Sequence, residues 1–155
     1  MAHPTNQECH AFTVEICRGD RDAHIFCDLW FNYCHGIDDL IDTMEDGRPT
    51  MKPEAVLSLF ANAAALYNCP FFVRYRDQLL SVALLVTSAY ADSVAWERSP
   101  IKRRRIIADV LRCCGDEMFF IVAMLTGGWA HVRSVSSRIR ERDWILQHDE
   151  DDNPN

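Results

Sequence analysis

Hydrophobic residues recur at helical spacing along most of the chain, and turn signals divide them into blocks. The clearest block runs from Arg21 to about Glu45, with apolar residues at positions 25, 26, 29, 30, 33, 37, 40, 41 and 44. These positions share one side of a helix. Gly19-Asp20 provides a stop and an N-cap before the block, and the segment from Asp46 to Pro49 ends it.

Four further helices are predicted after this one, with breaks at Cys69-Pro70, Ser99-Pro100 and Gly127-Gly128. They run from Pro53 to about Tyr67, from about Phe71 to Trp96, from Ile101 to about Thr126, and from Trp129 to about Gln147. We therefore predict an all-α fold, a bundle of about five helices joined by short loops.

The two ends of the chain carry weaker signals. Phe12, Val14 and Ile16 alternate with polar residues, as in a strand, but a lone strand has no partner in an all-helical chain, so we predict a helix there. Residues 148–155 (HDEDDNPN) form an acidic end that we expect to be disordered. The remainder, residues 1–147, is predicted to be a single helical domain.

Composition narrows the class of protein. Of the 155 residues, 48% are hydrophobic, which predicts a folded core, and the net charge of −7 argues against nucleic-acid binding. The N-terminus has no apolar signal-peptide region, and the seven cysteines are an odd number, so we expect reduced, buried thiols in a cytoplasmic protein. The longest apolar run, Met118 to Leu125, is too short to span a bilayer and predicts a central helix or the interface of a homodimer.

Three carboxylates, Asp38, Asp39 and Asp42, stand between His35 and Arg48. On the first long helix they lie away from the apolar stripe. One explanation of this placement is an amphipathic helix with a solvated acidic face. However, the segment from Ala23 to Asp46 holds six acids and no Lys or Arg, and such repulsion is destabilising. A bound Mg²⁺ relieves it, and the four-residue spacing lets Asp38 and Asp42 reach the same ions, with Asp39 as an auxiliary ligand.

The sequence Asp38-Asp39-Leu40-Ile41-Asp42 resembles DDxxD, the first aspartate-rich motif of the isoprenoid synthases (prenyl diphosphate synthases and class I terpene synthases). The upstream Leu29-Trp30-Phe31 is also similar, and Arg48 stands where that family has its second arginine. The resemblance spans about 20 residues. It implies an all-α fold, Mg²⁺ held by the aspartates, a prenyl diphosphate that the metal grips and helps to ionise, and Arg48 as a diphosphate contact.

Two other functions remain open. The all-α nucleoside triphosphate pyrophosphohydrolases are similar in size and in using two acidic helices with Mg²⁺; that likeness makes Asp109, Asp116 and Glu117 a possible second metal site. Alternatively, the chain is a non-catalytic helical interaction protein whose acidic face meets a basic partner.

The one dense basic run, Lys102 to Arg105, opens a predicted helix, where positive charge opposes the macrodipole. It is either a solvated basic turn or an anion-binding segment, and Arg103 and Arg104, with His35, are further candidate contacts for a diphosphate. No serine or cysteine paired with a base and no glycine-rich phosphate loop stands out, so no catalytic residue is predicted. The favoured function is Mg²⁺-dependent binding and chemistry of a small-molecule diphosphate.

Overall fold

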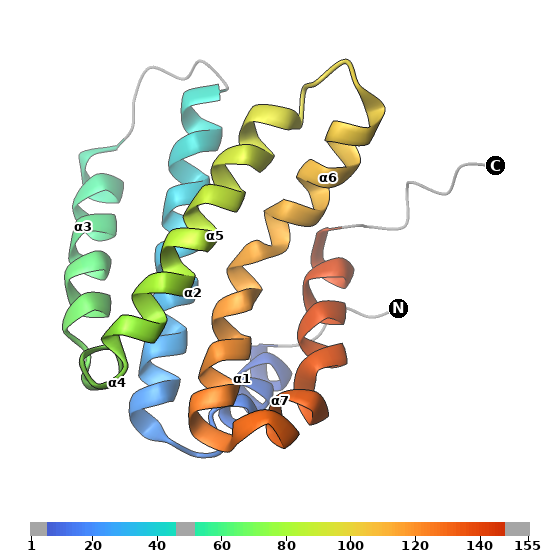
Figure 1. The fold of residues 1–155 in the computed structure, drawn as a ribbon. Helices are drawn as coiled ribbons and strands as arrows, with labels where there is room; N and C mark the ends of the chain where they lie inside the picture. The colour runs from blue at the N-terminus through green and yellow to red at the C-terminus, as the bar shows by residue number, and fades with distance from the viewer. Residues whose placement is uncertain (1–5, 46–51, 148–155) are drawn as a thin grey trace. The chain divides into compact units, whose positions relative to one another are not determined.

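The structure is a computed structural model that describes residues 6–45 and 52–147, with side chains over 10–41 and 52–140. All regular structure in these ranges is helical, which confirms the all-α prediction, including a helix near the N-terminus. In chain order the elements are α1 (Asn6–Ile16), α2 (Arg21–Glu45), α3 (Pro53–Asn68), α4 (Pro70–Arg74), α5 (Arg76–Trp96), α6 (Lys102–Arg112), the 3-10 helix η1 (Cys113–Asp116) and α7 (Glu117–Gln147) (Figure 1).

Two compact units make up the chain. One is continuous, Asp20–Arg76, and the other combines Met1–Gly19 with Asp77–Asn155. Both fall largely within the single domain predicted over residues 1–147, while the end predicted to be disordered, 148–155, lies outside the described residues. Each unit is described by itself below.

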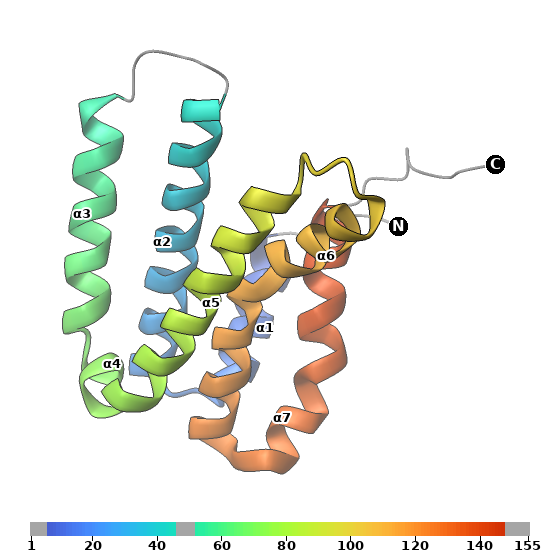
Figure 2. The ribbon, with the colours of Figure 1, turned by 45° about the horizontal axis from the view of Figure 1, so that its top comes forward.

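In the continuous unit, α2 and α3 lie side by side (Figures 1 and 2). The two helices approach closely at Gly36, where a β-carbon would stand 3.2 Å from Leu59 Cδ1. Aromatic rings fill the end of the unit near α4: the ring of Phe26 lies 5.6 Å from that of Phe71 and 6.3 Å from that of Phe72. All three of these side chains are buried, so burial of aromatic surface fixes α4 against α2.

The start of α2 follows the predicted stop and cap. Gly19 has a φ of 77°, the left-handed conformation that ends many helices, and ends the turn that follows α1. Asp20 then accepts hydrogen bonds on Oδ1 from the backbone N–H groups of Asp22 (2.9 Å) and Ala23 (3.1 Å). The N-cap prediction is therefore confirmed at this position.

The discontinuous unit is built around the first half of α7. Met118, Val122 and Ala123 are almost fully buried, which confirms that the apolar run beginning at Met118 supplies core residues. The ion pair between Arg112 and Glu97 joins α6 to the end of α5, and Arg112 also lies over the ring of Tyr90. Two polar side chains of this unit that are buried or half-buried donate hydrogen bonds to backbone carbonyl groups of α5. Ser93 donates to the Tyr90 carbonyl, and the Cys114 thiol of η1 donates to the Val86 carbonyl.

Two of the predicted helices are interrupted, which corrects the sequence-based boundaries. The helix predicted over 71–96 breaks at Tyr75, whose φ of −118° and ψ of 28° end α4. The Phe71 and Phe72 rings of α4 are buried within their own unit. The helix predicted over 101–126 gives way to η1 at Cys113–Asp116, where Gly115 weakens the helix and Asp116 is buried. Tertiary packing overrides the helical periodicity at both places.

The break predicted at Gly127-Gly128 is confirmed. Gly128 has a φ of 72° and a ψ of −175°, a conformation that is not helical. The two parts of α7 therefore run in different directions on either side of this residue, as Figure 2 shows.

Within the described residues, α5 is long and apolar enough to cross a membrane by length and composition, with a mean hydropathy of 1.5 over its most apolar window. Of that window, 22% is buried inside the structure, and Leu84 and Leu85 are exposed on it. The buried residues of α5, such as Leu79 and Val86, belong to the core of their unit. Core helices of water-soluble proteins satisfy the same criterion of length and composition.

Candidate metal and diphosphate site

The predicted aspartate-rich segment lies in the C-terminal half of α2, which is one continuous helix of 25 residues. Because Asp38 and Asp42 are four residues apart in it, the two positions share one side of the helix. Asp39 is offset by one residue from Asp38. The helical spacing that the prediction requires is therefore present.

The two aspartates whose side chains are described differ in exposure. Ala23, Phe26, Cys27 and Trp30 form the buried stripe of α2, and it continues into residues that are half-buried, such as Ile37. Asp38 stands at the edge of this stripe and is itself half-buried, whereas Asp39 is exposed. The face is therefore not uniformly solvated, and Asp38 is the carboxylate held closer to packed protein.

His35 is held one turn before Asp39 by two contacts with Phe31. Its Nδ1 atom lies 3.1 Å from the Phe31 carbonyl oxygen, and the two rings are 4.0 Å apart between centroids. A carbonyl oxygen accepts and never donates, so Nδ1 carries the proton and Nε2 of the neutral ring keeps its lone pair. Metal-binding histidines commonly have this arrangement, in which the second ring nitrogen donates to a backbone carbonyl.

The sequence predicts that α2 binds a hard cation through few protein ligands. Among the side chains that the structure describes, no three His, Cys, Asp or Glu are placed to hold a metal ion together. Mg²⁺ does not need such a cage, because it keeps several waters and is usually bound by one or two carboxylates plus the phosphates of a substrate. Asp38 and Asp39 supply carboxylate oxygens of the kind Mg²⁺ prefers.

Two members of the predicted site lie outside what the structure describes. The backbone of Asp42 belongs to α2, but its side chain is outside the described range. Arg48 lies outside the described residues altogether. Their roles as metal ligand and diphosphate contact stay predictions.

The second predicted acidic group belongs to the other unit and is spread over three elements. Asp109 is exposed on α6, Asp116 is buried at the end of η1, and Glu117 is exposed at the start of α7. Glu117 accepts a hydrogen bond from Arg140 Nη1 at 3.2 Å. This ion pair gives Glu117 a structural role within its unit, since both residues lie on α7 and Arg140 also covers the ring of Phe120 at 4.6 Å.

Arg103 and Arg104, the other predicted diphosphate contacts, begin α6 but differ in their surroundings. The Arg104 guanidinium lies over the ring of Trp96, 5.9 Å from its centroid. Arg103 is exposed, one turn before Ile106 and two turns before Val110. Their contact with a diphosphate stays a prediction.

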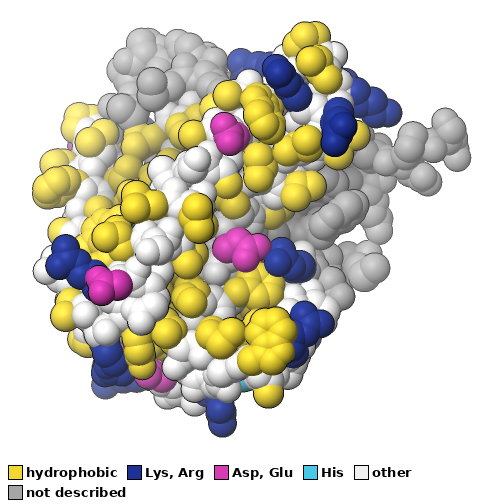
Figure 3. All heavy atoms as spheres, in the orientation of Figure 1, with side chains coloured by type: hydrophobic (Ala, Val, Ile, Leu, Met, Phe, Trp, Pro, Cys, Tyr) yellow, Lys and Arg dark blue, Asp and Glu magenta, His cyan; other side chains and the backbone are white. Residues whose placement is uncertain are grey.

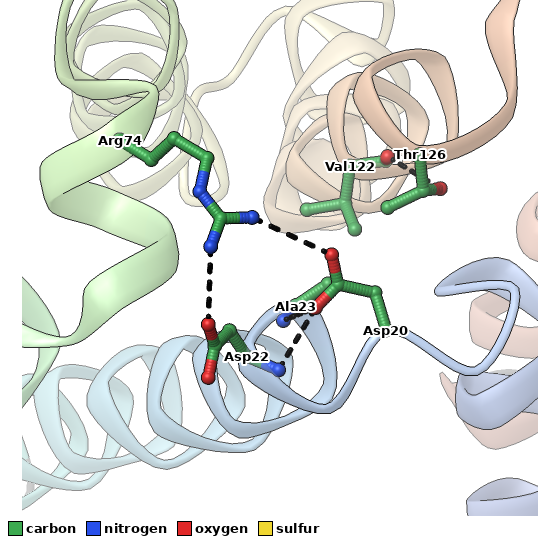
Figure 4. Close-up of polar contacts among 6 residues, drawn as sticks. All are labelled: Asp20, Asp22, Ala23, Arg74, Val122 and Thr126. Carbon is green, nitrogen blue, oxygen red and sulfur yellow. Dashed lines mark hydrogen bonds and ion pairs between the residues drawn. The ribbon is translucent and has the colours of Figure 1, made fainter.

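An acidic cluster that the sequence did not single out stands at the other end of α2. Arg74 Nη2 donates to Asp22 Oδ2 at 3.2 Å, and Nη1 lies 3.7 Å from Asp20 Oδ2 (Figure 4). The guanidinium thus neutralises two carboxylates at the helix N-terminus, where negative charge is already favourable. Only the N-capping residue of this group had a sequence signal, because Arg74 is 52 residues from Asp22 in the chain.

The described cysteines are free thiols. Burial was predicted for them and holds for Cys17, Cys27 and Cys69, whereas Cys34, Cys113 and Cys114 are half-buried. Burial raises the pKa of the Cys69 thiol, and burial raises the pKa of the Cys114 thiol to about 11. Burial and the neighbouring Tyr67 also raise the pKa of the Tyr33 phenol. These groups stay protonated at neutral pH, so none of them is an activated nucleophile.

No protein-family model, no curated protein and no solved structure matches the chain.

Proposed function

We propose that the C-terminal half of α2 binds Mg²⁺ together with a small-molecule diphosphate, and that the protein acts on that substrate as an isoprenoid synthase-like enzyme. Asp38 and Asp42 are the main metal ligands, Asp39 is an auxiliary ligand, and Arg48 and His35 contact the diphosphate. Mg²⁺ bound there would neutralise diphosphate charge and favour its departure with the bonding electron pair. The proposal uses α2 and Arg48 only, because the other candidate residues belong to the discontinuous unit.

The single observation that carries the proposal is the half-buried position of Asp38 in an uninterrupted helix that also contains Asp42. A carboxylate beside packed protein loses water, and a bound cation offsets that loss. The orientation of His35 adds support, because its Nδ1 is engaged by the Phe31 carbonyl and a proton on Nε2 would make that atom a donor to a diphosphate oxygen.

Thermal unfolding of the full chain, with and without millimolar Mg²⁺, tests the metal site. The test pair is Asp38→Asn with Asp42→Asn, which removes two charges and keeps the side-chain shape. The control is Asp28→Asn, an exposed acid on the same helix that lies 3.4 Å from His24. At ten times its dissociation constant Mg²⁺ should stabilise the wild type and the control by about 1.4 kcal/mol, or roughly 3–5 °C.

The double variant should be unaffected by Mg²⁺, and inorganic diphosphate should add to the stabilisation of the wild type only when Mg²⁺ is present. If Mg²⁺ leaves the wild type unchanged and the double variant is at least as stable, the acids form a repelling, solvated face, and the proposal is wrong. That result would favour the non-catalytic interaction protein.

Product analysis then distinguishes the two enzyme classes. A prenyl diphosphate incubated with the protein and Mg²⁺ should release inorganic diphosphate with loss of the carbon–oxygen bond. A pyrophosphohydrolase would instead convert a nucleoside triphosphate to the monophosphate and diphosphate, and would leave the prenyl diphosphate intact. Loss of prenyl diphosphate turnover in Asp38→Asn, with Asp28→Asn active, is the expected result.

A further inference from the structure

The outward face of α6 combines basic and apolar side chains. Lys102, Arg103, Ile106 and Val110 share one side of the helix, because Ile106 follows the two cations by four and three residues and Val110 follows Ile106 by four. Ile106 is 53% exposed and Val110 is 70% exposed, while Ala108, on the opposite side, is buried. In Figure 3, basic side chains surround hydrophobic ones over the start of α6.

The charge of this segment is not neutralised within the described part of the chain. None of the four cations from Lys102 to Arg105 forms an ion pair with a described carboxylate: Arg104 covers Trp96, and Arg105 donates to the Ser99 carbonyl at 2.8 Å. By contrast, the arginines elsewhere that hold carboxylates are Arg74, Arg98, Arg112, Arg138 and Arg140. Single cations such as Arg76 and Arg133 also have no ion pair with a described carboxylate, but Lys102 to Arg105 place four such cations in succession.

The placement of this charge is unfavourable for the helix itself. Cations at a helix N-terminus oppose the macrodipole, and Lys102 to Arg105 repel one another as neighbours. Over its 11 residues α6 has five cations and one acid, Asp109, in a protein whose net charge is −7. A negatively charged surface outside the chain would offset both penalties.

We propose that α6 docks on an anionic lipid bilayer, lying in the plane of the interface with Ile106 and Val110 entering the headgroup region. A basic helix with exposed apolar residues is the pattern of helices that bind in this way. Lys102 and Arg103 would contact lipid phosphates, and the two aliphatic side chains would gain from leaving water. A nucleic acid offers phosphates, but no apolar environment for Ile106 and Val110. This inference is independent of the metal site on α2.

Vesicle co-sedimentation of the full chain tests the docking surface. The vesicles are pure phosphatidylcholine, or equal parts of phosphatidylserine and phosphatidylcholine. The wild type should bind the anionic vesicles only, and binding should weaken strongly at high salt. Lys102→Gln with Arg103→Gln should weaken binding by about 25-fold, because each basic residue near an anionic surface contributes roughly fivefold.

A second variant separates membrane docking from general attraction to polyanions. Ile106→Ser with Val110→Ser should weaken binding to anionic vesicles by at least about tenfold, since the aliphatic side chains would no longer leave water. Any binding to duplex DNA should be the same as in the wild type. Matched controls are Arg133→Gln, an exposed cation on α7, and Val73→Ser, an aliphatic residue that is 62% exposed. All four substituted proteins are first compared with the wild type by thermal unfolding.

Three results would overturn the proposal: no binding of the wild type to anionic vesicles, equal loss of binding in the controls, or unaltered vesicle binding after Ile106→Ser with Val110→Ser. If vesicle binding is unaltered in that variant and duplex DNA binds as tightly as vesicles do, Lys102 to Arg105 bind polyanions in general. Because none of these measurements uses Mg²⁺ or a diphosphate, failure here leaves the proposal for α2 untouched.

Discussion

His131 holds the last carbonyl group of α1, with its Nε2 atom 3.0 Å from the backbone oxygen of Ile16. The Thr126 hydroxyl lies 3.1 Å from the same oxygen, and also 3.0 Å from the Val122 carbonyl on its own helix (Figure 4). The last carbonyl groups of a helix have no partner within it, so these donors satisfy a group that burial would otherwise penalise. Because a carbonyl only accepts, the neutral His131 ring carries its proton on Nε2.

The bend at Gly128, between Thr126 and His131, should be intolerant of a side chain. Its φ of 72° with a ψ of −175° is a conformation that is essentially restricted to glycine. We expect Gly128→Ala to lower the free energy of unfolding by about 1–3 kcal/mol. Urea titration followed by circular dichroism measures this change, with Ser137→Ala, an exposed substitution on α7, as the control.

Gly127→Ala should destabilise the protein for a different reason. A β-carbon at Gly127 would stand 2.5 Å from Cβ of His131 and displace the ring that donates to Ile16. The variant should therefore cost about as much as His131→Ala, and combining the two should cost less than their sum. Full additivity would show that Gly127 and His131 are not coupled, against what the geometry requires.

Asp20 should matter more to stability than Asp22, although Arg74 contacts both. Asp20 accepts two backbone hydrogen bonds as the N-cap of α2, and replacement of such a cap by alanine costs about 1 kcal/mol. Asp22 contributes a half-exposed ion pair, of which the usual value is about 0.2–1 kcal/mol. In urea titrations Asp20→Asn should retain most of the stability that Asp20→Ala loses, and equal loss in the two would argue against capping.

The close approach of α2 and α3 should limit the size of residue 36. At Gly36 a β-carbon meets only the end of the Leu59 side chain, at 3.2 Å, so Gly36→Ala should be nearly neutral because alanine also favours the helix by about 1 kcal/mol. Gly36→Val should destabilise by about 1–3 kcal/mol through overpacking. Leu59→Ala made on the Gly36→Val background should restore part of that loss, and thermal unfolding of the three variants and the wild type measures it.

Much of the architecture could be predicted because its signals are local. The apolar stripe of α2, the cap at Asp20 and the glycine bend at Gly128 each depend on a few neighbouring residues, and the structure has all three. The interruptions at Tyr75 and η1 were missed because they depend on what those residues pack against. Helical periodicity continues through both places in the sequence, and the lone Gly115 at η1 is too weak a local signal to predict a break against it.

The candidate site was predictable only as a pattern of charges on one helix. Spacing alone placed Asp38 and Asp42 on one side of α2, but it did not show that Asp38 is half-buried or that His35 donates to Phe31. Those properties depend on rings and backbone groups that surround the acids. The pairing of Arg74 with Asp22 was equally inaccessible, since 52 residues separate them and any acid is a plausible partner for an arginine.

Cys114 provides a prediction for alkaline conditions. Its thiol donates to the Val86 carbonyl at 3.3 Å, and burial raises its pKa from the usual 9.0 to about 11. The unfolded chain therefore ionises this thiol at a lower pH than the folded protein does. Stability from Cys114 is fully present below pH 9 and is lost as the pH rises from 9 towards 11. Over that range the wild type should lose more stability than Cys114→Ala does, as measured by urea titration.

The same property predicts that iodoacetamide at pH 8 modifies Cys114 slowly in the folded protein and rapidly in urea, as peptide mass spectrometry would show. Equal rates in the two states would mean that the thiol is neither buried nor hydrogen-bonded as described.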